Sequence, residues 1–219
     1  MTRSRGIALF TRGMYVLGIF LCMAIALASY RYLIPGAPMP EVIADNRLRT
    51  GWLVVHAVCG ATALLVGPWQ FWAKLRARAP RVHRWLGRAY GVGCILGGIS
   101  GVMLALGAST GIVSTFGFGL LGIAWVHTTA QGWRTAMQRD FRWHRVWMIR
   151  SFALTLAAVT LRIYIPLSFF FPFGFENSYR AISFLCWVPN LLVAELYLRR
   201  RGLVRHAQSA ATGEVMQAA

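Results

Sequence analysis

Four of the five histidines fall on or beside four different apolar stretches of the chain. They are His56, His83, His127 and His144. A neutral imidazole nitrogen is a good axial ligand for haem iron, and an imidazole can also transfer protons near neutral pH. In a bundle of transmembrane helices, imidazoles from facing helices can hold a cofactor in a core that excludes water. The four histidines are therefore the first candidates for a cofactor-binding site.

His83 and His144 form the best-matched pair. Residues 70–84 and 131–145 align without a gap and share six residues of fifteen, against roughly one expected by chance, so we infer an internal duplication. The alignment places the two imidazoles at the same depth, which predicts them as axial ligands of haem iron. Two alternatives stay open. Each imidazole, with the arginine that follows it, could cap a helix start or meet lipid phosphate, or it could transfer protons.

His56 and His127 are also predicted as cofactor-binding residues, but they differ in depth. At 1.5 Å per helical residue, His56 lies about 8 Å and His127 about 22 Å below the outer membrane edge. A haem held between them would be strained. His56 is nevertheless a strong candidate for function, because ionisable groups inside a membrane span are rare and usually face a cavity. The alternative for His56 is a neutral ring that is hydrogen-bonded across helices.

Arg162 is the charged residue whose burial costs most, because it lies inside the fifth apolar stretch, about 12 Å from the outer edge. Burying it alone costs at least ~2.5 kcal/mol. His56, Asn190 and Tyr164 are expected at similar depths. These four residues predict an outward-opening polar pocket for a haem propionate, a quinone carbonyl or a small anion.

The alternative for Arg162 is that its side chain reaches a carboxylate, Glu176 or Asp45, in the outer loops. Glu195 is the one carboxylate within an apolar stretch, and it lies too far toward the inner end to neutralise Arg162. We expect Glu195 to pair with the basic inner loops instead.

The elements that position these residues are transmembrane helices. Hydrophobic residues make up 57% of the 219 residues and charged residues only 13%, with a mean hydropathy of +0.54. A helix needs about 20 apolar residues to cross the hydrocarbon, and backbone groups in lipid must be paired internally. Six segments meet that length: about 14–33, 51–73, 85–107, 112–133, 146–170 and 181–198. We predict an all-α integral membrane six-helix bundle, with one transmembrane domain over 1–198 and a disordered cytoplasmic tail over 199–219.

The formal charge of +17 follows the same membrane pattern. Of the 23 Lys and Arg residues, 18 fall in four short blocks, within 3–12, 74–88, 134–150 and 199–205. By the positive-inside rule these blocks and both termini are cytoplasmic, where they would meet anionic headgroups. No separate basic stripe is present, so nucleic-acid binding is excluded. An Ala-x-Ala pattern at Ala26 and Ala28 resembles a signal-peptidase site, but the apolar run continues to Ile34 and favours a retained span.

The duplication predicts that the central four helices are two parallel copies of one helix hairpin. Several glycines on the third and fourth spans should allow close helix approach: Gly93, Gly97, Gly101, Gly119 and Gly122. Six tryptophans near the inner edge are expected to form an aromatic belt: Trp69, Trp72, Trp85, Trp133, Trp143 and Trp147. The four cysteines lie singly in four spans, so we expect small buried side chains rather than metal ligands.

Several strings resemble a bacterial membrane family catalogued as a domain of unknown function, of the family 2306 type. They are H-x3-G-A-x-A-L-L-x-G-P-x-Q-F from His56, H-R-W-L-G-R-A-Y from His83, H-R-V-W-M-I-R-S from His144, T-L-R-I from Thr160 and W-V-P-N-L-x-V-A-E from Trp187. The resemblance implies a multi-helix inner-membrane protein and brings no activity with it. The histidine layout is also similar to that of transmembrane cytochrome b proteins.

These patterns support three functional hypotheses. The first is an electron-transfer protein, a membrane oxidoreductase if it is an enzyme, that binds haem b or a quinone. The second is a small-solute or proton-linked carrier that uses Arg162, His56 and Asn190. The third is an accessory subunit of a larger membrane complex, or a homo-oligomer. The sequence contains no Walker loop, Rossmann glycine pattern, zinc-protease motif or nucleophile elbow.

Overall fold

The computed structural model describes residues 2–34, 36–205 and 207–208, and every element in that part of the chain is a helix. The elements are α1 (Thr2–Ser29), the 3₁₀ helix η1 (Tyr30–Leu33), α2 (Glu41–Ala44), α3 (Arg49–Gln70), α4 (Ala73–Arg78), α5 (Pro80–Leu106), α6 (Ile112–Met137), α7 (Phe141–Thr155), α8 (Ala157–Ser168), α9 (Phe175–Leu185) and α10 (Val188–Arg200).

Six helical stretches are long and apolar enough to cross a membrane: Gly13–Leu33, Arg49–Gln70, Pro80–Leu106, Ile112–Met137, Phe141–Ser168 and Phe175–Arg200. The predicted all-helical fold with six membrane spans is confirmed. Residue 206 and residues 209–219 of the predicted tail lie outside the described residues.

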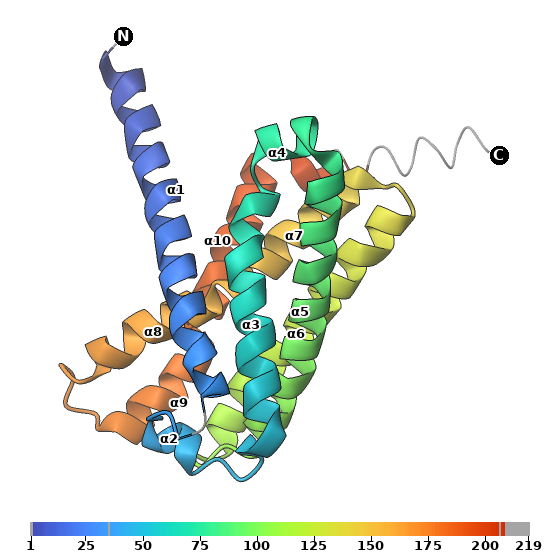
Figure 1. Ribbon diagram of the computed structural model, residues 1–219. Helices are drawn as coiled ribbons and strands as arrows, with labels where there is room; N and C mark the ends of the chain where they lie inside the picture. The colour runs from blue at the N-terminus through green and yellow to red at the C-terminus, as the bar shows by residue number, and fades with distance from the viewer. Residues whose placement is uncertain (1, 35, 206, 209–219) are drawn as a thin grey trace.

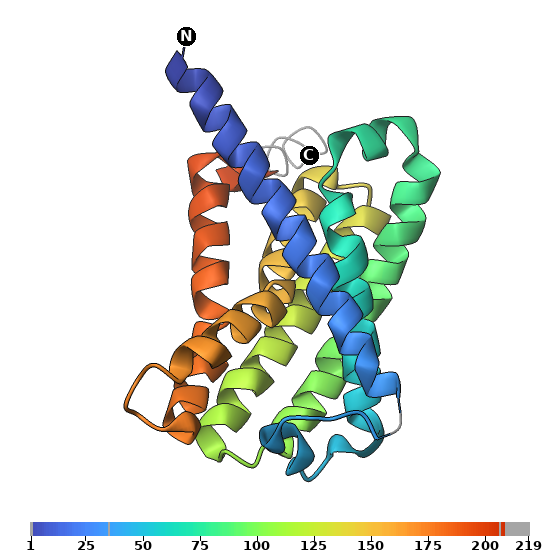
Figure 2. The same ribbon diagram turned by 60° about the vertical axis from the view of Figure 1, so that its left-hand side comes forward.

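The helices stand side by side, with α3, α5, α6 and α7 at the centre (Figure 1). The start of α1, α4 and the end of α10 lie at one end of the bundle, which we name the α4 end. The opposite α2 end carries α2 and the α8–α9 connection (Figures 1 and 2). The last turns of α1 lie near α3 and α8, whereas its first turns stand apart from the bundle.

Glycines let the central helices approach until backbone meets backbone. A Cβ atom built on Gly93 of α5 would lie 2.9 Å from the carbonyl oxygen of Cys59 on α3. A Cβ on Gly122 of α6 would lie 2.9 Å from the Gly98 carbonyl oxygen on α5. Side chains cannot fit at such contacts, so small residues are required there. Gly119, by contrast, has only an ordinary contact, 3.9 Å from Ala105 Cβ.

A closed ring of hydrogen bonds joins α5, α6 and α7 in the bundle core. The Trp125 indole N–H donates to Thr155 Oγ1 (2.9 Å), which lies 2.8 Å from Tyr90 Oη. Tyr90 lies 3.0 Å from Ser151 Oγ, and Ser151 lies 2.7 Å from Thr129 Oγ1. Thr129 donates back to the Trp125 carbonyl at 2.8 Å. The Thr155 hydroxyl also lies 3.0 Å from the Ser151 carbonyl, so six contacts share five hydrogens, and each of the five donors has an acceptor within the network.

The fifth and sixth spans are each divided into two helices, whereas the sequence predicts continuous spans over 146–170 and 181–198. Leu156 separates α7 from α8, and the Thr155 and Thr160 hydroxyls bond carbonyls four residues earlier, which tends to bend helices. Residues 186–187 separate α9 from α10. Pro189, the second residue of α10, has no amide hydrogen to donate to the preceding turn.

Residues 70–84 and 131–145, which suggest the internal duplication, match in where a helix begins but not in where the preceding helix ends. His83 and His144 are each the fourth residue of their helices, α5 and α7. However, α3 ends at Gln70, while its aligned partner Gln131 lies six residues before the end of α6. The duplicated hairpins therefore stay a prediction.

Candidate functional site

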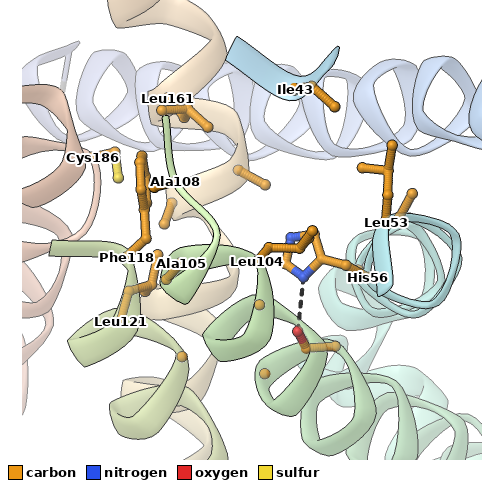
Figure 3. Close-up of a pocket in the computed structure, with 18 of the residues that line it drawn as sticks. Ile43, Leu53, His56, Leu104, Ala105, Ala108, Phe118, Leu121, Leu161 and Cys186 are labelled. Atoms are coloured by element: carbon orange, nitrogen blue, oxygen red, sulfur yellow. Dashed lines mark hydrogen bonds between the residues drawn. The ribbon is translucent and has the colours of Figure 1, made fainter. Parts of the chain in front are cut away.

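A cavity of about 240 Å³ lies inside the α2 end of the bundle. Its lining comes from α3, α5, α6, α7, α8 and α9, and from the segments around α2. Most lining side chains are apolar, such as Leu53, Leu104, Phe118, Leu121 and Leu161, and Figure 3 shows them around an open centre. Gly98 and Gly122, which bring α5 and α6 into contact, also line the cavity.

His56 supplies the imidazole of this cavity. It projects from α3 toward α5, where its Nδ1 lies 2.8 Å from the Gly97 carbonyl oxygen (Figure 3). A carbonyl oxygen can only accept, so Nδ1 must carry the hydrogen. In the neutral ring, Nε2 is then an acceptor with a free lone pair. A Cβ built on Gly101 would lie 3.1 Å from the ring, so the glycine makes room for it.

Arg162 of α8 lines the same cavity, whose walls are mostly apolar, whereas the sequence predicts a polar pocket around this residue. Its guanidinium donates to the Ala158 carbonyl (3.0 Å) and to Ser29 Oγ on α1 (2.9 Å). It contacts neither of the carboxylates considered as alternatives, and Glu176 pairs instead with Arg180 (3.2 Å). The remaining N–H groups of Arg162 are available to a ligand.

Asn190 and Tyr164 do not line this cavity, although the sequence places them at similar depth. The Asn190 amide donates to Thr160 Oγ1 (2.8 Å) and to the Cys186 carbonyl (3.1 Å). Tyr164 packs against the apolar cluster around Ile182. Of the four predicted pocket residues, the structure therefore brings together His56 and Arg162.

Some cavity residues carry no signal in the sequence. Thr110 and Tyr179 line the cavity from the α5–α6 connection and from α9. The Thr110 side chain is 4% exposed, and its hydroxyl has no partner among the described residues. Trp125 contributes its ring to the wall while its N–H joins the Tyr90 ring of hydrogen bonds. A threonine in a short connection is ordinary, so only the tertiary fold identifies it.

The other predicted histidines lie away from the cavity. His144 Nδ1 donates to the Gly132 carbonyl (2.8 Å), which leaves its Nε2 free as in His56. His83 lies close enough to His144 for an electrostatic interaction, and its buried Nδ1 has no partner among the described residues. His127 packs edge-on against Trp147, with ring centroids 5.7 Å apart. The structure thus brings His83 near His144 but shows no contact between His56 and His127.

The carboxylates and thiols of the described residues do not form a further candidate binding site. No group of three or more His, Cys, Asp or Glu side chains there is arranged to hold a metal ion. Glu195 forms a bidentate ion pair with Arg150, which belongs to one of the basic blocks, as expected for an inner-end carboxylate. Cys22, Cys94 and Cys186 are buried single thiols.

Residues 53–198 match the family DUF2306, which is described as a predicted membrane protein. The chain belongs to this family. No curated protein and no solved structure matched the chain. The DUF2306 match includes His56, Arg162, His83 and His144, and it excludes α1 with Ser29. The family membership and the six spans together identify an integral membrane protein.

Proposed function

We propose that this DUF2306 protein is a membrane electron-transfer protein that binds the ring of a quinol or quinone in the cavity beside His56. The observation that carries the proposal is the acceptor nitrogen of His56 in an apolar cavity. A quinol hydroxyl can donate to His56 Nε2, and a quinone carbonyl can accept from Arg162. The apolar walls suit the ring.

The size of the cavity favours one small ring system. Pockets for drug-sized ligands measure about 300–1,000 Å³, and this cavity measures about 240 Å³. A single aromatic head group would fill it, with any isoprenoid chain outside.

The chemistry follows from the tautomer of His56. Oxidation of a quinol to a quinone releases two electrons and two protons, and the free Nε2 of His56 can take one of these protons. The other proton passes to water, and the two electrons pass one at a time to a separate one-electron carrier in the membrane, which is part of this proposal. A b-type haem is the second candidate cofactor, and the feature that favours it is the proximity of His83 to His144, whose Nε2 is free.

We also propose an orientation of the protein in the membrane. We place the α4 end, with its basic blocks, on the cytoplasmic side of a bacterial inner membrane. Both ends of the described chain then face the cytoplasm, and the His56 cavity lies in the outer half of the bilayer.

The test is the dissociation constant of a short-chain quinol for the protein in lipid nanodiscs, measured under reducing conditions. His56→Asn keeps an amide donor for the Gly97 carbonyl but removes Nε2, so affinity should fall roughly tenfold or more. His127→Asn is the matched control and should bind like the wild type. Equal affinity in His56→Asn and wild type would refute the proposed site.

The haem candidate has its own test. Purified protein should show a Soret band and a reduced-minus-oxidised alpha band, both lost in His83→Ala or His144→Ala and retained in His127→Ala. A folded, colourless preparation that binds quinol would refute the haem hypothesis and support the quinol site.

A further inference from the structure

The connection between α3 and α5 is a concentrated patch of positive charge. Residues 74–88 contain six cationic side chains, and no Asp or Glu occurs anywhere between Asp45 and Asp140. Asp140 accepts a hydrogen bond from the Trp143 amide, and Glu195 is paired with Arg150. Neither ion pair of the described residues involves residues 74–88.

Two buried polar atoms in this region lack hydrogen-bond partners in the described chain. They are Nε2 of Gln70, the last residue of α3, and Nδ1 of His83 in the first turns of α5. The Gln70 side chain lies against α5, since its Oε1 would be 3.3 Å from a Cβ on Gly87. Gly87 is one helical turn from His83 on the same face of α5. The Gln70 and His83 side chains therefore lie about one helical turn apart along α5.

Arg76 of α4 joins these two residues into one cluster. Its guanidinium donates to the Gln70 carbonyl (2.9 Å) and lies within electrostatic range of His83, as do Arg84 and His144. We name Gln70, Arg76 and His83 the hairpin cluster. It offers an amide N–H₂, an imidazole and the remaining guanidinium N–H groups, so it is rich in donors.

We propose that the hairpin cluster binds a phosphate group, supplied by the headgroup of an anionic phospholipid. A phosphate oxygen accepts hydrogen bonds from Arg and amide donors and neutralises the local charge. The position fits a lipid, because Trp69 and Trp72 lie beside the cluster, 6.1 Å apart, and indoles sit at headgroup level. This site is at the opposite end from the His56 cavity and does not depend on the quinol proposal. Nε2 of His83 is not used, so the site is also compatible with iron ligation there.

The experiment measures lipids retained by the full-length protein in native mass spectrometry, with phosphatidylglycerol or phosphatidylcholine added to detergent. A parallel series measures the melting temperature with each lipid and with inorganic phosphate. We expect saturable retention of phosphatidylglycerol over phosphatidylcholine. Gln70→Met removes the amide donor at constant length and should reduce this retention at least several-fold.

Two further measurements distinguish lipid binding by the cluster from a purely structural role of Gln70 and from a general effect of positive charge. In lipid-free detergent, Gln70→Met should melt at or above the wild-type temperature, since it removes an unpaired buried donor. A merely structural Gln70 would instead lower the melting temperature in every condition. Arg199→Gln, which removes one exposed charge from the last turn of α10, should retain phosphatidylglycerol as the wild type does, whereas Arg76→Gln should not.

The outcomes assign the source of the phosphate. If inorganic phosphate alone raises the melting temperature of the wild type but not of Gln70→Met, the site binds phosphate from solution as well as from lipid. Equal retention of both lipids, or equal losses in Arg76→Gln and Arg199→Gln, would overturn the proposal.

Discussion

The Tyr90 ring of hydrogen bonds and the His56 cavity place polar groups in the same apolar bundle, yet in opposite states. Around Tyr90, hydrogen bonds join five side chains and two backbone carbonyls, and every donor has an acceptor within the network. Around His56, one nitrogen is fixed by the Gly97 carbonyl and the other has no partner in the described chain. The first arrangement has all its donors paired, whereas the second leaves one acceptor nitrogen without a partner in the described chain.

This difference separates structure from function within one set of helices. A satisfied polar network stabilises a unique packing, whereas an unpaired polar atom beside a cavity is available for binding. Substitutions at the Tyr90 ring should therefore change stability, and substitutions around His56 should change ligand affinity. Three variants test the packing of these helices and the division between the two regions, in order of decreasing effect.

Gly93→Ala should have the largest effect. Its new Cβ would lie 2.9 Å from the Cys59 carbonyl oxygen, and backbone cannot yield as a flexible side chain can. We expect the free energy of unfolding to fall by about 2 kcal/mol, measured by reversible unfolding in mixed micelles. Gly119→Ala on α6 is the control and should be neutral. Matching stabilities for the two variants would contradict the close packing of α3 on α5.

Tyr90→Phe should have an intermediate effect. It removes the hydroxyl that links Thr155 to Ser151 in the hydrogen-bond network, while the phenyl group still fills the core. The expected loss of unfolding free energy is about 1 kcal/mol, with no change in quinol affinity. Tyr164→Phe is the matched control, since the Tyr164 hydroxyl has no hydrogen bond in the described residues. Weaker quinol binding in Tyr90→Phe would contradict the separation between the stabilising Tyr90 network and the ligand-binding His56 cavity.

Gly101→Ala should have the smallest effect and the most selective one. The added methyl group presses on the His56 ring, 3.1 Å away, and turns Nε2 from its position. Quinol affinity should fall roughly threefold, a change below about 1 kcal/mol, while the melting temperature stays near that of the wild type. A stability loss as large as that of Gly93→Ala would show that the His56 imidazole contributes to helix packing rather than to ligand binding.

The sequence predicts the six spans because apolar length alone decides membrane insertion. It also predicts Arg162 in the cavity wall, since a cation at that depth requires a polar surrounding. It could not place Asn190, because helical depth does not specify the direction in which a side chain points. The breaks at Leu156 and before Pro189 turn α8 and α9, and such tertiary bends decide which residues of the fifth and sixth spans face the cavity.

The location of the bound ring tests the central proposal most directly. An azido-substituted short-chain quinone, photolysed on the protein in nanodiscs, should label cavity residues such as Leu53, Leu104 and Phe118. Excess unlabelled quinol should prevent this labelling, and His56→Asn should reduce it. Labelling confined to the exposed phenylalanines at 169–173, or to the α4 end, would contradict the account.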